Sequence, residues 1–328
     1  MKFMRFMGYL SVLVSCGTGN IALAQEAAKG QAQTYPSRPV RLIVAFAPGS
    51  PTDIVARVVG QGLGETWGRT VVVENRPGAG GIIGSQTAKR ANPDGYTILV
   101  NSVSFAINVS LHSDPGYAIK DFTPVALGPV TPNIITVHPS VKASNLQELI
   151  ALAKTTPMSY ASSGAGTSPH LNMEQLFRVN SKVDITHVPM GPPQAVAAAA
   201  GNQVQISATA MATAVPQITA GRVRAIALTS ATRSAILPDV PTVAESGFPG
   251  FSDRTWFSFF VPAGTPSAIV NQLNAEINRI LLRPDAKVRL DALSLEFAPR
   301  SAAEFAASLN IEVANYQKMV KQAGLKAN

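Results

Sequence analysis

The residues best suited to hold a ligand lie in a short loop near residue 50. Residues 42–47 form an unbroken apolar run of strand length, typical of a strand buried on both faces. The loop that follows reads Pro48-Gly49-Ser50-Pro51-Thr52-Asp53, where Ser50 suits a helix N-cap and Asp53 the N3 position of a capping box. A helix N-terminus offers unpaired N–H groups and the positive end of a dipole. The loop predicts a carboxylate or phosphate site that needs no Arg or Lys; the alternative is a capped helix in an ordinary βα unit.

A second loop has a similar composition. Residues 159–162 are predicted to form a short strand, and Ser163-Gly164-Ala165-Gly166-Thr167-Ser168 follows it directly. A helix is then predicted over residues 169–177. His170 comes just after this loop and is a candidate ligand contact. His187 lies in a strand pattern, and we expect it to be structural.

Several common chemistries lack their motifs. The hydrolase elbow G-x-S-x-G and the P-loop do not occur, and residues 78–84 miss G-x-G-x-x-G because Ile83 occupies the third glycine position. The four histidines lack the spacing of a metal motif, and no paired carboxylates stand out. We therefore expect no metal, no cofactor and no catalysis. The alternative is a secreted enzyme that uses a serine of residues 162–163, for which His170 is the candidate base.

The elements around these loops alternate between strands and helices. Predicted strands at 42–47, 70–74 and 96–100 enclose predicted helices, the second of them over 82–91, which implies a parallel sheet with right-handed crossovers. A second βα series runs through residues 159–229. Two α/β lobes would place the glycine- and hydroxyl-rich loops at the carboxyl ends of strands, where such sheets bind ligands.

The N-terminus predicts export. Residues 1–24 resemble a secretory signal, with Lys2 and Arg5, an apolar stretch, and Ala22-Leu23-Ala24 as the cleavage site. Residues 25–35 are expected to be a leader. The location is then periplasmic; alternatively, the lipobox-like sequence ending at Cys16 would give a lipid-anchored protein. Cleavage after Ala24 removes the only cysteine and leaves 25 basic against 19 acidic residues, a formal charge of +6. The basic residues form no dense run, so we expect no nucleic-acid partner.

With these loops in place, the chain resembles the Bug/TctC family of periplasmic solute receptors. The matching motifs run in order along nearly the whole mature chain: Pro48-Gly49 with Thr52-Asp53, Val73-Glu74-Asn75-Arg76-Pro77-Gly78-Ala79-Gly80-Gly81, Asp94-Gly95-Tyr96, residues 160–171, Gly201-Asn202-Gln203-Val204, Leu237-Pro238-Asp239-Val240-Pro241-Thr242, and Pro262-Ala263-Gly264-Thr265-Pro266.

The resemblance implies an α/β, two-lobed periplasmic-binding-protein fold of type II, with the ligand cleft between the lobes. Residues 36–129 and 230–328 would form lobe 1, and residues 130–229 lobe 2. Loops 48–53 and 162–168 would pinch a ligand carboxylate, with Asp53 capping its helix and ordering water. The ligand-binding residues would be Pro48, Gly49, Ser50, Thr52, Asp53, Asn101, Ser102, Ser104, Ser162, Ser163, Gly164, Gly166, Thr167, Ser168, His170, Gly191 and Thr209.

Departures from the family pattern bear on the ligand. Ser50 replaces a common glycine, residues 189–193 lack the usual Tyr and Lys, and residues 204–209 lack two common acids. The ammonium of an amino acid would need a carboxylate partner, so their loss argues against such a ligand. Met190 and Pro192 indicate an apolar far wall. These features favour a simple or aromatic carboxylate.

The predicted function follows from this resemblance. The chain is expected to be a monomeric solute-binding protein that captures a small carboxylate and delivers it to the membrane subunits of a tripartite tricarboxylate transporter. One alternative is a sensor component that presents the same ligand to a membrane kinase. The serine-dependent enzyme remains the other.

Overall fold

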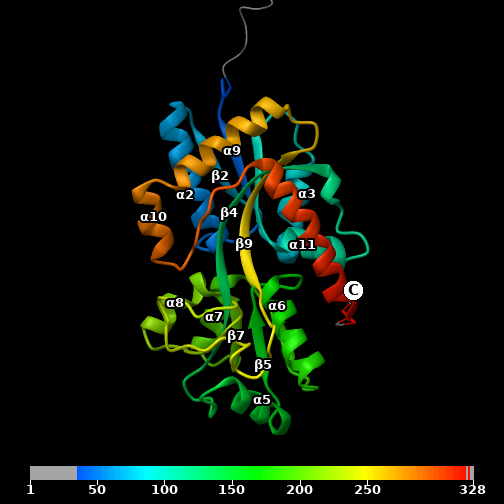
Figure 1. Ribbon diagram of the computed structural model, residues 1–328, viewed down its shortest axis with the longest axis vertical. Coiled ribbons are helices and arrows are strands. Elements are labelled where there is room, and N and C mark those ends of the chain that lie inside the picture. Colours follow the sequence, from blue (N-terminus) through cyan, green and yellow to red (C-terminus); the bar gives the residue numbers. More distant parts are fainter. Residues whose placement is uncertain (1–34, 323, 326–328) are drawn as a thin grey trace, which may run out of the picture. The chain divides into compact units, whose positions relative to one another are not determined.

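The computed structural model describes residues 35–322 and 324–325. The predicted signal peptide (1–24), most of the predicted leader, and Cys16 lie outside the described residues. From Arg38 onward the described chain forms one compact unit of mixed α/β structure (Figure 1).

A first group of strands contains the parallel unit that the sequence predicts. Its strands are β1 (Val40–Val44), β2 (Val71–Asn75) and β3 (Thr97–Ser102), with β1 central and parallel to both neighbours. Strand β9 (Arg254–Pro262) joins β3 in antiparallel register. The helices that follow or cover these strands are α2 (Pro51–Trp67), α3 (Ile82–Lys89), α4 (Ser104–Leu111), α9 (Ser267–Leu281), α10 (Pro284–Asp291) and α11 (Ala302–Gln322).

A second group of strands repeats this arrangement. Strand β5 (Ser159–Ser162) lies between β6 (Thr186–Pro189) and β7 (Ile206–Ala210) and is parallel to both. Strand β8 (Arg224–Leu228) pairs with the long strand that the next paragraph describes. Its helices are α5 (Leu146–Thr155), α6 (Ser168–Met173) with a π-helical continuation (Glu174–Asn180), α7 (Pro192–Ala200) and α8 (Met211–Thr219).

One long strand, β4 (Phe122–Val137), belongs to both groups. Its first part pairs with β9, and residues 133–137 pair with β7 and β8. Residues 122–137 are therefore one continuous strand, and β4 and β9 run together through the middle of Figure 1. The predicted lobe limits at 129/130 and 229/230 stay predictions.

Separate apolar clusters support the two groups. In the first group Phe105 stacks on Phe260, with 4.2 Å between ring centroids, and Phe122 and Phe305 pack around them. Helix α4 is buried on most sides, and its sequence shows no apolar stripe that would have marked it as a helix. The second group has its own core around α5 and β5, so each group holds its loops on a packed framework.

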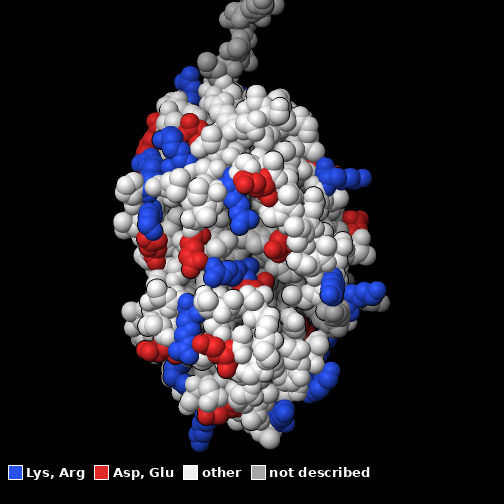
Figure 2. All heavy atoms as spheres, viewed as in Figure 1, with Lys and Arg blue, Asp and Glu red and all other residues white. Residues whose placement is uncertain are grey.

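The surface carries mixed charge. On the face shown in Figure 2, basic and acidic side chains are interspersed rather than segregated. Within the described residues, every helix is too short or too polar to cross a bilayer.

Candidate functional site

Two adjoining cavities lie where loops of the two strand groups meet. The larger, here called the main cavity, has a volume of about 1000 Å³. The smaller, here called the hydroxyl pocket, has a volume of about 20 Å³. Both are lined by Phe46, Ser163 and Pro192, so they adjoin each other as a narrow end and a wide end.

Hydroxyl groups dominate the polar lining of the narrow end. They come from loop 48–53, here the first loop, from the end of β3 and the start of α4, from Thr255 of β9, and from loop 162–168, here the second loop. Six of the predicted ligand contacts line this pocket: Thr52, Ser102, Ser104, Ser163, Thr167 and Ser168. The structure thus brings together residues that are up to 116 positions apart, as the two-loop prediction required.

The protein already uses some of these hydroxyl hydrogens. Thr167 Oγ1 donates to the carbonyl oxygen of Gly164 at 2.7 Å, and Ser168 Oγ donates to Asp253. Ser102 and Ser104 share one hydrogen bond of 2.9 Å, which occupies only one of their two hydrogens. Among the described residues, the hydroxyls of Thr52 and Ser163 have no hydrogen-bond partner. Each loop therefore contributes to the lining of the same small pocket one residue whose hydroxyl makes no hydrogen bond within the described residues.

Ionic contacts hold the first loop. Ser50 caps α2 by accepting from the Asp53 backbone N–H at 3.3 Å, and Asp53 accepts from the Gly49 N–H at 2.9 Å. Asp53 also accepts from Asn75 at 2.9 Å and pairs with Arg57 at 2.9 Å. Burial raises the pKa of Asp53, but these bonds outweigh it and leave the pKa below its ordinary value. Asp53 is therefore ionised and stabilises the conformation of the loop. It does not line either cavity.

Two stacked histidines support the second loop. His187 Nε2 and Ser162 Oγ are 2.7 Å apart, and the Gly166 N–H donates to His170 Nδ1 at 3.4 Å. The two rings are parallel, with centroids 4.2 Å apart. Burial lowers the pKa of each histidine to about 4. Both rings are neutral at pH 7, and neither His170 nor Ser162 lines the cavities.

A half-buried carboxylate, Asp253, lies behind the second loop. Asp253 Oδ2 accepts from Ser168, from Asn172 at 2.9 Å and from Asn133 at 3.2 Å, and Oδ1 accepts from Tyr316 of α11 at 3.0 Å. Burial raises its pKa, and the hydrogen bonds oppose that shift. No sequence motif marked Asp253, because its partners are 63 to 120 positions away.

The remaining predicted residues lie around the site. Pro48 and Gly49 are the exposed part of the first loop, while Asn101 is fully buried, donates to Ser85 and accepts from the Ser102 N–H. Thr209 is buried in β7, where its hydroxyl lacks a partner among the described residues. Gly164 and Gly191 line the main cavity, and Gly166 lies beside Asn108 of α4.

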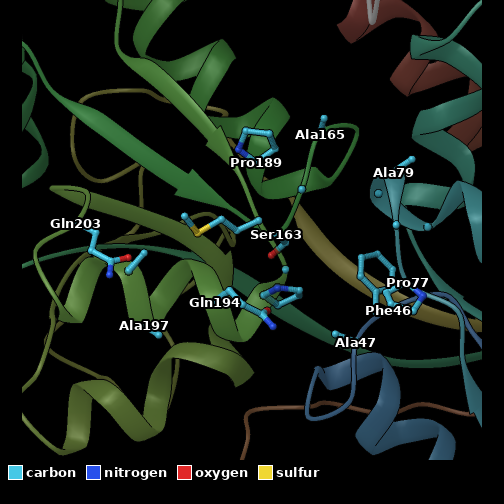
Figure 3. Close-up of a pocket in the computed structure, with 18 residues that line it drawn as sticks. Phe46, Ala47, Pro77, Ala79, Ser163, Ala165, Pro189, Gln194, Ala197 and Gln203 are labelled. Carbon is cyan, nitrogen blue, oxygen red and sulfur yellow. The ribbon is translucent and has the colours of Figure 1, made fainter.

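The sequence predicted only some of the residues that line the main cavity. Figure 3 shows Phe46, Ala47 and Pro77 on one side of Ser163, and Gln194, Ala197 and Gln203 on the other. The wall formed by residues 77–81 was not predicted. Its glycine-rich turn was the available signal: it matches a family motif and narrowly misses the dinucleotide motif, but neither pattern marks it as a ligand contact. Met190 and Pro192, expected as an apolar wall, do line the cavity.

Two glycines let the walls approach each other. Gly80 has φ +59°, and a Cβ there would overlap the carbonyl oxygen of Ala165 in the second loop. Asn108 Nδ2 donates to the Gly80 carbonyl at 3.0 Å and lies next to Gly166. Only backbone fits between these loops, so the structure represents a state in which the two sides of the site touch.

No obvious metal site accompanies these loops. Within the part of the chain that the structure describes, no three His, Cys, Asp or Glu side chains are grouped to hold a metal ion. The eighteen residues lining the main cavity include no charged side chain and no histidine.

Comparison with known proteins places the chain in one family. The sequence model for the tripartite tricarboxylate transporter family receptor, TctC, matches residues 55–325. A relative from Pseudomonas sp. strain P51, a UPF0065 protein of the tcbD-tcbE intergenic region, is 36% identical over 316 residues, covering 94% of both chains.

Solved structures agree with this match. The periplasmic binding protein BugD is 35% identical with a TM-score of 0.85, covering 90% of this chain and all of its own. Rpa4515 of R. palustris, solved with adipate, is 31% identical with a TM-score of 0.85, covering 89% and 99%. MatC of Rhodopseudomonas palustris, solved with malate, is 32% identical with a TM-score of 0.82, covering 87% and 100%. The expected periplasmic-binding-protein fold is confirmed.

Proposed function

Since the chain belongs to the tripartite tricarboxylate transporter receptor family, TctC, we propose that it captures a small carboxylate outside the cytoplasmic membrane and delivers it to membrane transporter subunits. The family consists of solute-binding receptors. We propose, beyond this family role, that the ligand is a carboxylate, that the protein acts outside the cytoplasmic membrane, and that it delivers its ligand to a transporter.

One observation carries this function. The free hydroxyls of Thr52 and Ser163 come from opposite loops and line the same hydroxyl pocket. An ionised carboxylate only accepts hydrogen bonds, and bonds to an ionised acceptor are stronger than neutral ones. Its oxygens can therefore satisfy both hydroxyls and draw the two loops together.

The rest of the pocket suits the same ligand group. The Ser102–Ser104 pair keeps one hydrogen outside its mutual bond, which supplies a third donor. A pocket of about 20 Å³ holds one water-sized group, such as a carboxylate oxygen. That the related Rpa4515 and MatC were solved with adipate and malate supports a carboxylate here.

A thermal-shift screen tests the proposal. The purified mature protein, stripped of carried-over ligand, is melted with a panel of carboxylates and with the matched primary amides, for example benzoate against benzamide. A ligand that binds only the folded state raises Tm, and at 100 times Kd it contributes about 2.7 kcal/mol. We expect a rise for at least one carboxylate and none for its amide. Equal rises within each pair, or no rise for any carboxylate, would contradict it.

Delivery and location are tested in cells. The proposal includes export through the predicted signal of residues 1–24. The alternative is a lipid anchor at Cys16. Fractionation of an epitope-tagged full chain should place it in the periplasm. Uptake of the radiolabelled ligand should fall in a strain that lacks the chain, and an unchanged uptake would contradict the delivery step.

A further inference from the structure

A third cavity, here called the α11 pocket, lies apart from the site described above. It has a volume of about 370 Å³ and shares no lining residue with the main cavity or the hydroxyl pocket. Helix α11 forms one wall, and strands β4 and β9 contribute to the other (Figure 1). We propose that this pocket is a second binding site, for a small organic ammonium ion that carries a hydroxyl group and an apolar body. This site goes beyond the proposed function and does not depend on it.

Two carboxylates determine the charge of the ligand. Asp253 and Glu312 both line the pocket and are half-buried. Burial raises the pKa of Glu312, and the charge of Asp253 raises it further, so the two groups are close enough to repel each other. Among the described residues, neither carboxylate forms an ion pair with a basic side chain. An ammonium ion bound at Glu312 would offset this repulsion.

The basic residues that line the pocket are engaged elsewhere. Arg254 Nη1 pairs with Glu296 at 2.7 Å. Arg300 is exposed and lowers the pKa of Glu304, which lies in the first turn of α11. At about 1.5 Å per residue, Glu312 lies roughly 12 Å farther along the helix than Glu304. The end of the pocket near Glu312 is therefore acidic and favours a cation.

Trp256 supplies an unused donor at the same end. It lines the pocket and is only 7% exposed, and its indole N–H has no hydrogen-bond partner among the described residues. The N–H is near enough to Glu312 to oppose the rise of that pKa, but the two groups do not reach hydrogen-bond geometry. Buried N–H groups are rarely left without an acceptor. A ligand hydroxyl between the two groups can accept from Trp256 and donate to Glu312.

The remaining lining suits an apolar body rather than a metal ion. The rings of Trp256 and Phe305 are 6.2 Å apart and nearly perpendicular, and Leu309 lies on the same face of α11 as Phe305. Aromatic faces also attract ammonium groups. Within the part of the chain that the structure describes, no three His, Cys, Asp or Glu side chains are grouped to hold a metal ion. An amino alcohol with an alkyl chain combines the cation, the hydroxyl and the apolar body that this pocket suits.

Tryptophan fluorescence tests the site, because the chain has only two tryptophans, Trp67 and Trp256. In the Trp67→Phe variant of the mature chain, Trp256 is the sole reporter. Leucinol is titrated alongside 4-methylpentan-1-ol, which lacks the ammonium, and 4-methylpentan-2-amine, which lacks the hydroxyl. We expect leucinol to change the emission saturably, and to bind about tenfold tighter than the alcohol and severalfold tighter than the amine. No change with leucinol, or equal binding of leucinol and either analogue, would overturn the inference.

Two variants locate the ammonium group. Glu312→Gln removes the charge at similar side-chain size, and Glu304→Gln removes the same charge from an exposed position of α11 outside the pocket. A glutamine at position 304 can still serve the capping box that Glu304 forms with Ser301. We expect Glu312→Gln to weaken leucinol binding about tenfold and Glu304→Gln to leave it unchanged, with circular dichroism verifying that both are folded. Equal affinities of the two folded variants would show that Glu312 does not hold the ammonium and would overturn the inference.

Discussion

The first and second loops present equivalent hydroxyls to one pocket but are held in different ways. Behind the first loop, the ionised Asp53 is paired with Arg57, whose side chain is 54% exposed. Behind the second loop, His170 is buried while His187 and Asp253 are half-buried, and the partners of Asp253 come from β4, α6 and α11. The comparison shows that two loops with similar hydroxyls can be held by different interactions, an ion pair behind the first and a cluster of hydrogen bonds behind the second.

The largest expected difference between the loops is in stability. Asp253→Asn places an amide among four hydrogen-bond donors, and we expect it to lower the free energy of unfolding by about 3 kcal/mol. Asp53→Asn is the matched change in the first loop. It should cost about 1 kcal/mol, since the pairing with Arg57 is partly screened by solvent.

Urea unfolding monitored by circular dichroism checks this pair of variants. Equal costs for Asp53→Asn and Asp253→Asn would show that the two loops are supported equally, contrary to the comparison above.

A second difference between the loops is their dependence on pH. His170 has a pKa of about 4 in the folded state and about 6.5 when unfolded. Between these values the unfolded chain binds a proton that the folded chain does not, so stability falls as pH drops from 6.5 to 4. The loss from His170 should be on the order of 2 kcal/mol. Asp253 and Glu312, whose pKa values burial raises, act in the opposite direction.

Melting temperatures between pH 4 and 7 measure this effect. His170→Gln should reduce the dependence, while His187, whose pKa burial also lowers to about 4, keeps its own share. A wild-type slope in His170→Gln would mean that the second loop is not stabilised by a neutral His170.

A smaller effect is expected on the affinity for a carboxylate when a substitution keeps the two walls of the main cavity apart. Gly80→Ala and Gly49→Ala both put alanine at positive φ, +59° and +76°, so both carry a similar backbone strain. Only at Gly80 does the new Cβ meet the opposite loop; at Gly49 it meets open space. We expect Gly80→Ala to weaken carboxylate binding about tenfold relative to Gly49→Ala, measured by calorimetry. Equal affinities would indicate that the contact between the walls is not needed for binding.

Local signals made much of the fold predictable from the sequence. The apolar run at 42–47 and the cap at Ser50 identify β1 and α2 without reference to the rest of the chain. Local signals do not identify strand β4 as one strand shared by both groups, because that depends on the distant strands with which its two parts pair. Helix α4 is buried on most sides and has no polar face to mark its period.

The site was predictable to the level of its loops but not of its atoms. Composition indicated that residues 48–53 and 162–168 present hydroxyls, and the structure brings both loops to one pocket. Which hydroxyls are free depends on partners such as Asp253, which is 85 positions from Ser168. A single sequence contains no signal for such a pairing.

The most direct test of the central claim is a calorimetric double-mutant cycle on Thr52 and Ser163. Thr52→Val, Ser163→Ala and the double variant are titrated with the tightest carboxylate from the screen, and Thr66→Val on the far end of α2 is the control. Each single variant should lose about tenfold in affinity, since each removes one bond to an ionised acceptor. The double variant should lose more than either, and the control nothing. A double variant that binds as tightly as the wild type would contradict the claim that these two hydroxyls hold the carboxylate.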